Sequence, residues 1–84
     1  MSLARDLVEF VGRALADHPD AIRVTETERR GVRHIALVTR PGDLGKLIGR
    51  QGRTAAAVRT LAELAGEMEG SRVTVDFLDE AGRE

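Results

Sequence analysis

The amino-acid sequence predicts an α+β protein with a three-stranded mixed sheet that is covered on one face by helices. Stretches with apolar residues at three- and four-residue steps, as in amphipathic helices, alternate with shorter stretches rich in β-branched residues, and glycine or proline separates them. Their order is helix, strand, strand, helix, helix, strand, so a hairpin joins the first two strands. The two-helix crossover that follows requires the third strand to run parallel to the second.

The first helix is expected to begin after Ser2, whose hydroxyl can accept a hydrogen bond from a free backbone N–H group. Its apolar residues recur on one side, which predicts a helix packed on a core: Leu3, Leu7, Val8, Val11, Ala14 and Leu15. The helix should end near Asp17-His18-Pro19, because proline removes a helix N–H group and disfavours helical geometry for the residue before it.

The first two strands are expected over residues 21–28 and 32–40. In the first strand Ile22 and Val24 lie on one side and polar residues on the other, which is the alternation of a half-buried strand. Residues 28–31 should form a turn. The second strand is more continuously apolar, so we expect it to be central in the sheet and buried on both faces.

The second half of the chain begins with a strand break at Pro41-Gly42-Asp43, where Asp43 is predicted to be the N-cap of a short helix. The longest helix is expected from Arg53 to about Met68, and Gly70-Ser71 should end it. Its predicted core stripe consists of Val58, Leu61, Ala62, Ala65 and Met68.

The final strand is expected over residues 72–78, with inward-pointing side chains at Val73, Val75 and Phe77. Phe10 of the first helix is assigned to the core as well. Residues 79–84 are polar and are expected to form a frayed tail.

Length and composition bound the class of protein. The 84 residues allow a single domain over residues 1–84, and a chain of this size buries only roughly 60–65% of its unfolded surface. The absence of cysteine excludes disulfides and thiolate metal sites and fits a reducing cytoplasm. No metal or cofactor is implied. Acidic residues at Asp6 and Glu9 and the lack of a long apolar run exclude a signal peptide and a membrane span, so we expect a soluble cytoplasmic protein.

The net charge of −1 conceals an uneven distribution along the chain. Residues 1–28 carry a net charge of −3 and residues 60–84 a net charge of −5. Residues 29–59 contain eight basic residues against Asp43 alone, a net charge of +7. The sequence therefore predicts one strongly electropositive region, which is typical of a surface that meets a polyanion.

That basic segment contains two Gly-x-x-Gly spacings. In Gly42-Asp43-Leu44-Gly45 the acidic residue would repel phosphate. In Gly49-Arg50-Gln51-Gly52 a guanidinium and an amide stand between two residues without Cβ, so another backbone could approach closely while both side chains point outward. A helix follows directly, and its free N–H groups favour an anion.

At these residues the chain resembles a known family. Ile48-Gly49-Arg50-Gln51-Gly52, preceded by Gly45-Lys46-Leu47 and followed by Arg53-Thr54, resembles the signature of KH domains, and the length resembles the small bacterial KhpA proteins. The resemblance implies a type II KH fold that clamps about four nucleotides of single-stranded RNA, with the backbone on the glycine loop and the bases in a groove. It also implies an RNA chaperone or post-transcriptional regulator.

The resemblance assigns roles to residues around the loop. Gly49 and Gly52 would admit the RNA backbone, Gln51 would offer hydrogen bonds, and phosphates would be neutralised by Lys46, Arg50 and Arg53. Because both phenylalanines are assigned to the core, base contacts would come from aliphatic groove residues: Leu44, Leu47, Ile48 and Val38. A plain core role for these four residues remains open.

Other chemistries find no support in the residues. A Walker loop needs Ser or Thr after Gly-Lys, whereas Leu47 follows Gly45-Lys46, and the glycine spacings do not match a dinucleotide fingerprint. His18 and His34 have no second ligand at metal spacing. No nucleophile stands beside a base, so we expect no enzyme activity.

The longest helix has an apolar arc wider than one sheet face requires, with Ala57, Leu61 and Leu64 at its edge. We expect this edge to support self-association or pairing with a partner, because uncovered apolar surface tends to be an interface. The resemblance points the same way, since KhpA-like proteins pair with themselves or with the larger KhpB. An alternative function is therefore a protein-interaction module whose basic patch meets an acidic partner.

Overall fold

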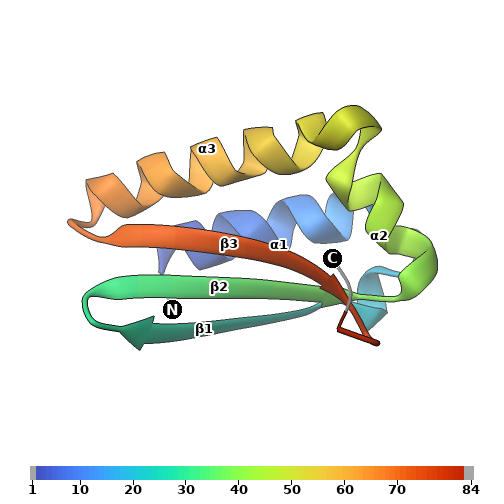
Figure 1. The fold of residues 1–84 in the computed structure, drawn as a ribbon, viewed down its shortest axis with the longest axis horizontal. Helices are drawn as coiled ribbons and strands as arrows, with labels where there is room; N and C mark the ends of the chain where they lie inside the picture. The colour runs from blue at the N-terminus through green and yellow to red at the C-terminus, as the bar shows by residue number, and fades with distance from the viewer. Residues whose placement is uncertain (1, 83–84) are drawn as a thin grey trace.

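A computed structural model of the chain describes residues 2–82 and has the predicted order of elements (Figure 1). The helices and strands are α1 (Leu3–Leu15), β1 (Arg23–Arg29), β2 (Val32–Thr39), α2 (Pro41–Ile48), α3 (Arg53–Met68) and β3 (Arg72–Asp79), with 3₁₀ turns η1 (Pro19–Ala21) and η2 (Arg50–Gly52). This order confirms the α+β prediction and is that of a type II KH fold. No helix in the described part is long and apolar enough to cross a membrane.

The sheet has the strand order β1-β2-β3, so the prediction that β2 is central is confirmed. β1 and β2 are antiparallel, and β2 and β3 are parallel, as the crossover requires. A two-residue turn, Arg30-Gly31, joins the hairpin, with φ values of 54° and 80°. Positive φ at both positions is the geometry whose twist matches that of the flanking strands.

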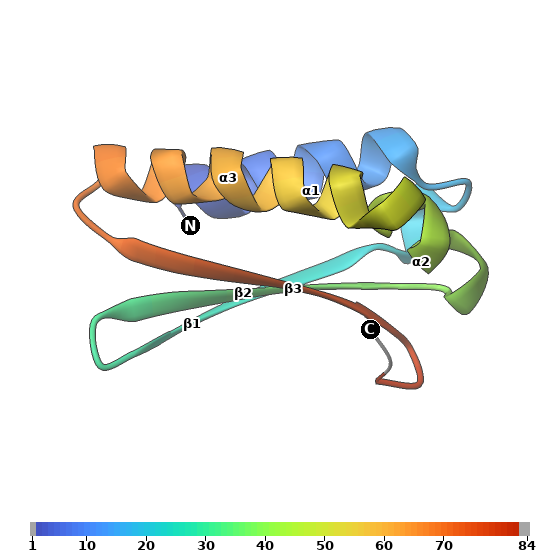
Figure 2. The same cartoon turned by 45° about the horizontal axis from the view of Figure 1, so that its top comes forward.

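The helices α1 and α3 lie side by side on one face of the sheet, and within residues 2–82 no helix covers the opposite face (Figures 1 and 2). The core lies between the two layers, and Phe77, Ile22, Ile35, Leu37, Leu47 and Val8 are its largest fully buried apolar side chains. The prediction that β2 is buried on both faces is wrong. Ile35 and Leu37 on its helix side are buried, whereas His34 on the other side is exposed, because only one helical layer exists.

The first helix begins as predicted, with the Ser2 Oγ accepting a hydrogen bond from the Arg5 backbone N–H at 3.1 Å. Its sheet-facing line is Ala4, Val8 and Gly12, and a Cβ at position 12 would collide with Leu37. The assignment of Phe10 to the core is wrong, since Phe10 is 73% exposed. Two residues correspond to about 200° around a helix, so Phe10 lies opposite Val8.

The last helix ends at the predicted glycine. Gly70 has a φ of 73°, and the Ser71 N–H donates to the Gly66 carbonyl at 2.8 Å, as in a Schellman motif. The core stripe is narrower than predicted and consists of Ala55, Val58, Ala62, Ala65 and Gly66. Leu61 and Met68 were placed in this stripe incorrectly, because small residues bring α3 close to the sheet and leave the two larger side chains outside.

Two further predictions are corrected. Asp43 is not an N-cap; Arg40 occupies the cap position, Pro41 opens α2, and Asp43 lies in the first turn with its side chain buried. Asp79 is not part of a frayed tail, because it closes β3 and is buried. The Asp79 carboxylate accepts a hydrogen bond from the Ala81 N–H at 2.9 Å, and residues 83–84 of the predicted tail lie outside the described residues.

Candidate nucleic-acid interface

The second glycine pair forms a turn between α2 and α3, at one end of the molecule (Figure 1). Gly49 ends α2 with φ 78° and ψ 175°, and Gly52 precedes α3 with φ 72° and ψ 13°. Both conformations are ones that residues with a Cβ rarely adopt. A Cβ on Gly49 would also collide with the Thr54 side chain, whereas the space around Gly52 is open.

Gln51 lies at the tip of this turn in the left-handed region, with φ 57° and ψ 25°. This conformation is uncommon for a residue other than glycine. The Gln51 side chain is exposed, and its Oε1 accepts a hydrogen bond from Arg53 Nη2 at 3.0 Å. The turn therefore exposes the side chains of both Arg50 and Gln51 to solvent.

The loop cations differ in their availability. Arg50 and Arg53 are exposed, and within residues 2–82 neither has a carboxylate at ion-pair distance. Lys46 is exposed too, but its ammonium pairs with the Asp17 carboxylate. The hydrogen bond that Lys46 donates to the Asp17 carboxylate raises the pKa of Lys46 above its ordinary value. Arg50 and Arg53 are therefore ready for an anion, whereas Lys46 must first leave Asp17.

Asp43 anchors the base of α2 to the connection after α1. Its carboxylate is 2% exposed and accepts a hydrogen bond from the His18 backbone N–H at 3.0 Å, with the His18 Nδ1 at 3.3 Å. Burial alone would raise the pKa of Asp43, but the hydrogen bonds from the His18 backbone and ring and from the Asp17 backbone outweigh it and lower the pKa. This contact holds the helix that leads into the loop.

The four aliphatic groove candidates are not equivalent. Leu44 and Leu47 are 7% and 1% exposed and belong to the core, so they offer a base almost no surface. This burial agrees with the plain core role that the sequence analysis left open for them. Ile48 is half-buried at the end of α2 and keeps an accessible edge.

Val38 is half-buried but lies away from the loop. It lines a shallow hollow of about 340 Å³ on the sheet side, and no loop residue lines that hollow: Asp20, Ala21, Arg23, Val38, Arg40 and Glu80. The structure therefore does not bring Val38 together with the other predicted site residues.

Arg59 is a further cation near the sheet that the sequence analysis did not assign to the site. It is half-buried on α3, its Nε donates to the Val75 carbonyl at 3.0 Å, and its guanidinium lies 5.3 Å from the centre of the Phe77 ring. Val75 belongs to β3, an edge strand of the sheet. This position depends on how α3 packs against β3, which no local pattern encodes.

The predicted single electropositive region divides in two. Lys46, Arg50 and Arg53 lie at the loop end, whereas Arg29 and Arg30 lie at the hairpin end of the sheet. The eight residues of β2 separate these ends by about 26 Å. The basic residues that are close together in the sequence therefore do not form one continuous patch on the surface.

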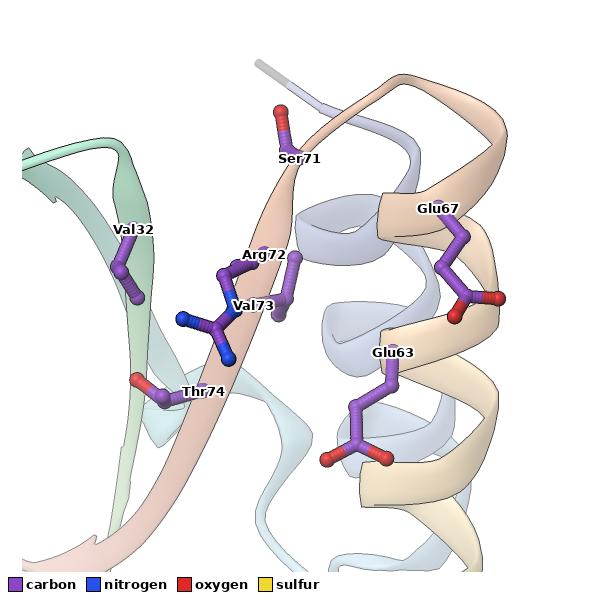
Figure 3. Close-up of a pocket in the computed structure, with 7 residues that line it drawn as sticks. All are labelled: Val32, Glu63, Glu67, Ser71, Arg72, Val73 and Thr74. Atoms are coloured by element: carbon purple, nitrogen blue, oxygen red, sulfur yellow. The ribbon is translucent and has the colours of Figure 1, made fainter.

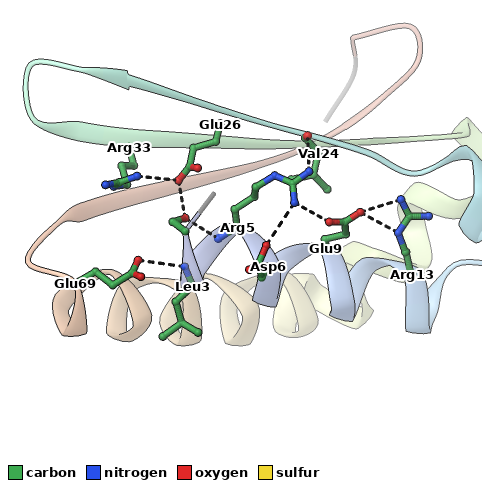
Figure 4. Close-up of polar contacts among 10 residues, drawn as sticks. Leu3, Arg5, Asp6, Glu9, Arg13, Val24, Glu26, Arg33 and Glu69 are labelled. Carbon is green, nitrogen blue, oxygen red and sulfur yellow. Dashed lines mark hydrogen bonds and ion pairs between the residues drawn. The ribbon is translucent and has the colours of Figure 1, made fainter.

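Several cations elsewhere are already paired with carboxylates. Figure 4 shows Arg5 and Arg13 bound to Glu9 of the same helix, at 2.7 and 2.9 Å, and Arg33 reaching Glu26 at 3.4 Å. Glu26 also accepts a hydrogen bond from the Ser2 hydroxyl at 2.6 Å. The hydrogen bonds from Arg13 and then Arg5 lower the pKa of Glu9. The Ser2–Glu26 contact joins the start of α1 to the hairpin. The ion pairs neutralise cations that would otherwise attract a polyanion.

The predicted interface residues Ala57, Leu61 and Leu64 are all exposed on α3. The helices α1 and α3 lie side by side, and both carry further exposed apolar residues (Figures 1 and 2). These exposed apolar side chains of the two neighbouring helices are here called the helix strip: Leu3, Phe10, Ala57, Leu61, Leu64 and Met68.

Comparisons with known proteins agree with this architecture. The chain is 44% identical over 75 residues to the RNA-binding protein KhpA of Halalkalibacterium halodurans, covering 89% of this chain and 99% of the relative. It is 42% identical over 79 residues to the RNA-binding protein KhpA of Aquifex aeolicus, covering 94% and 100%. It is 47% identical over 75 residues to the Mycobacterium tuberculosis protein of the same name, covering 88% and 89%.

A solved structure shares the fold. Aquifex aeolicus Era, crystallised as a variant bound to GDP·AlF4⁻, matches with a TM-score of 0.67 and 18% identity. The match covers 92% of this chain and 30% of the Era chain, so it concerns the fold of one part of Era. A family model described as KhpA/KhpB, KH domain matches residues 5–77, a range that includes the loop and both helices that flank it. The chain therefore belongs to the KhpA/KhpB family of KH domains.

Proposed function

We propose that this protein binds single-stranded RNA at the turn formed by residues 49–52. The observation that carries the proposal is the exposed, left-handed turn between α2 and α3, flanked by two arginines that have no carboxylate partner in the described chain. Relatives that cover nearly the whole chain carry the name RNA-binding protein KhpA, which supports the same ligand.

Each residue of the turn has a proposed task. Gly49 and Gly52 let an RNA backbone approach, Arg50 and Arg53 neutralise phosphates, and the Gln51 amide offers hydrogen bonds to the strand. Lys46 adds a third phosphate contact when it leaves Asp17. With about three phosphate contacts, the logarithm of affinity should fall with the logarithm of salt concentration at a slope near −2.

Ile48 is the remaining aliphatic candidate for base contact beside the turn, because Leu44 and Leu47 are buried. A footprint of about four nucleotides, as KH loops bind, gives modest affinity for one copy. In a cytoplasmic setting, such a module would serve as an RNA chaperone or a post-transcriptional regulator.

Substitution of the loop tests the proposal. Replacing Arg50 and Gln51 by aspartates should leave the circular dichroism spectrum unchanged and abolish binding of a short unstructured RNA, because two new carboxylates then face the phosphates. A matched pair refines the test: Arg50→Gln should weaken binding, whereas Arg13→Gln, which removes a guanidinium already paired with Glu9, should not. RNA binding retained by the double-aspartate variant would show that the loop is not the contact.

The alternative function, a module for protein pairing, draws on the helix strip. Six exposed apolar side chains on adjacent helices favour a protein partner, either a second copy or a larger KhpB-like KH protein. NMR signals distinguish the two functions: an added oligonucleotide should shift residues 44–54 if the loop binds RNA. Shifts confined to residues 57–68 would favour the pairing function alone.

A further inference from the structure

Ion pairing sorts the arginines of this protein into two groups. Arg5, Arg13 and Arg33 contact carboxylates, as described above. Other exposed arginines have no carboxylate at ion-pair distance within residues 2–82, and besides the loop they include Arg23, Arg29, Arg30, Arg40 and Arg72. The loop therefore does not hold all of the available positive charge.

Three of these arginines meet at the hairpin end of the sheet. Arg29 pairs with Val32 across β1 and β2, and Val32 pairs with Arg72 across β2 and β3. Paired residues point to the same face, so Arg29 and Arg72 both project from the open face, about 10 Å apart across two strand spacings. Arg30 occupies the adjoining turn. We call Arg29, Arg30 and Arg72 the hairpin cluster.

Arg30 is also conformationally unusual. Among residues 2–82 only two non-glycine residues have a positive φ: Gln51 at 57° and Arg30 at 54°. Asparagine and glycine suit the first position of such a hairpin turn, whereas arginine pays a steric cost there. Strained residues of this kind concentrate at functional sites. Gln51 lies in the proposed RNA-binding turn, and Arg30 lies in the hairpin cluster.

The surface beside the hairpin cluster suits a phosphate backbone. The next row of the open face is Thr27, His34 and Thr74, which are polar. The only acidic side chain that the strands project to this face is Asp76, because the alternation of β1 turns Glu26 and Glu28 toward the helices. A strand of phosphates crossing the face from this end meets cations and hydroxyls first.

Carboxylates limit the hairpin cluster on one side. Figure 3 shows Glu63 and Glu67 on α3 and Arg72 on β3, all of which line a groove of about 430 Å³. Neither carboxylate is at ion-pair distance from Arg72. They would repel phosphates along α3, so the path left for a nucleic-acid strand crosses the open face of the sheet.

We propose that the hairpin cluster is a second phosphate-binding site for single-stranded RNA, separate from the loop and able to hold a more distant part of the same strand or a second strand. This inference rests on the proposed function of the loop. The longest dimension of the molecule is 34 Å, and the two cationic sites lie toward its opposite ends. A segment of about four nucleotides occupies the loop alone, so only longer RNA can engage both sites.

The test compares two RNA lengths on the full chain. The triple variant Arg29→Gln, Arg30→Asn, Arg72→Gln removes the hairpin cluster, and asparagine before Gly31 favours the turn, so the fold should be retained. Binding of an unstructured RNA about four nucleotides long should be unchanged. Binding of an RNA about four times longer should weaken roughly tenfold, with a salt slope less steep by about 2, because three phosphate contacts are lost. Arg13→Gln serves as the control for removal of an arginine outside both sites.

The outcomes separate the two proposals. If the unmodified protein fails to bind the short RNA, the proposed function of the loop is wrong. If it binds the short RNA and the triple variant binds the long RNA with unchanged affinity and salt slope, the hairpin cluster is not an RNA site. Poly-glutamate provides a last comparison. If it binds the unmodified protein as tightly as the long RNA does, and the triple variant no longer binds it, the cluster is a site for an acidic protein and the inference is overturned.

Discussion

At the scale of single residues, conformation and chemistry are coupled around the loop. Gly49 and Gly52 were predicted to let a second backbone approach closely, because neither has a Cβ. The structure adds that both have a positive φ, so the turn itself requires glycine even without RNA. Gln51 between them tolerates the left-handed region at a steric cost and presents its amide at the tip.

Asp43 leads to a prediction of acid sensitivity. Its pKa is lower in the folded protein than in the unfolded chain. A lowered carboxyl pKa adds stability that is fully present above the unfolded value of about 3.9 and is lost as pH falls through the folded value. Urea unfolding at a series of pH values below 5 should therefore show that the parent protein loses stability as the pH falls. The Asp43→Asn variant should lose less over the same pH range. Asp76→Asn, on the exposed sheet face, is the control; an identical pH dependence in Asp43→Asn and the parent would contradict this role.

At the scale of elements, two carboxylates fix α2 against the connection after α1. Asp43 holds the His18 backbone from inside α2, and Asp17 holds Lys46 from outside it. Because α2 leads directly into the turn, these contacts determine where the loop stands. The Asp17 contact also occupies a cation that the proposed function needs.

Release of Lys46 should strengthen RNA binding. In the Asp17→Asn variant Lys46 no longer has to break an ion pair before it contacts a phosphate. The affinity for a short RNA should therefore rise by about twofold to fivefold, while the salt slope should stay near −2, because the number of phosphate contacts in the complex is the same. Fluorescence anisotropy at several salt concentrations measures both. Asp20→Asn, on the same connection but without an ion pair to Lys46, should bind like the parent. Unchanged binding in both variants would place Lys46 outside the site.

The elements themselves were largely predictable. Their order, the central place of β2, the Ser2 cap and the Gly70 stop all follow from periodicity and local turn chemistry. The predictions that were wrong concern which side chains of each helix are buried. Phe10 and Leu61 were placed in the core because apolar periodicity shows which side of a helix is apolar, and not how much of that side the neighbouring elements cover. Gly12 and the small residues of α3 let the helices pack closely, so a narrower part of each helix is buried.

At the scale of the whole molecule, the helix strip predicts self-association. Leu61 and Leu64 are 48% and 51% exposed on α3, and Phe10 is 73% exposed on the neighbouring helix α1. Leu61→Gln with Leu64→Gln should remove any dimer that sedimentation detects in the parent at high micromolar concentration, because the apolar area that drives association is lost. Leu15→Gln is a matched control, since Leu15 is 40% exposed but lies outside the strip. A strictly monomeric parent protein would contradict the proposal.

The sequence by itself determined the secondary structure, the parallel crossover and the glycine turn with its cations, because these depend on residues that are close together in the chain. Only the tertiary structure decided which charges are available. Ion pairs such as Lys46 with Asp17 and Arg33 with Glu26 form between elements, and strand register brings Arg72 into the same row as Arg29. A charge acts on its surroundings through distance in space, so its availability could be read only after the elements had packed.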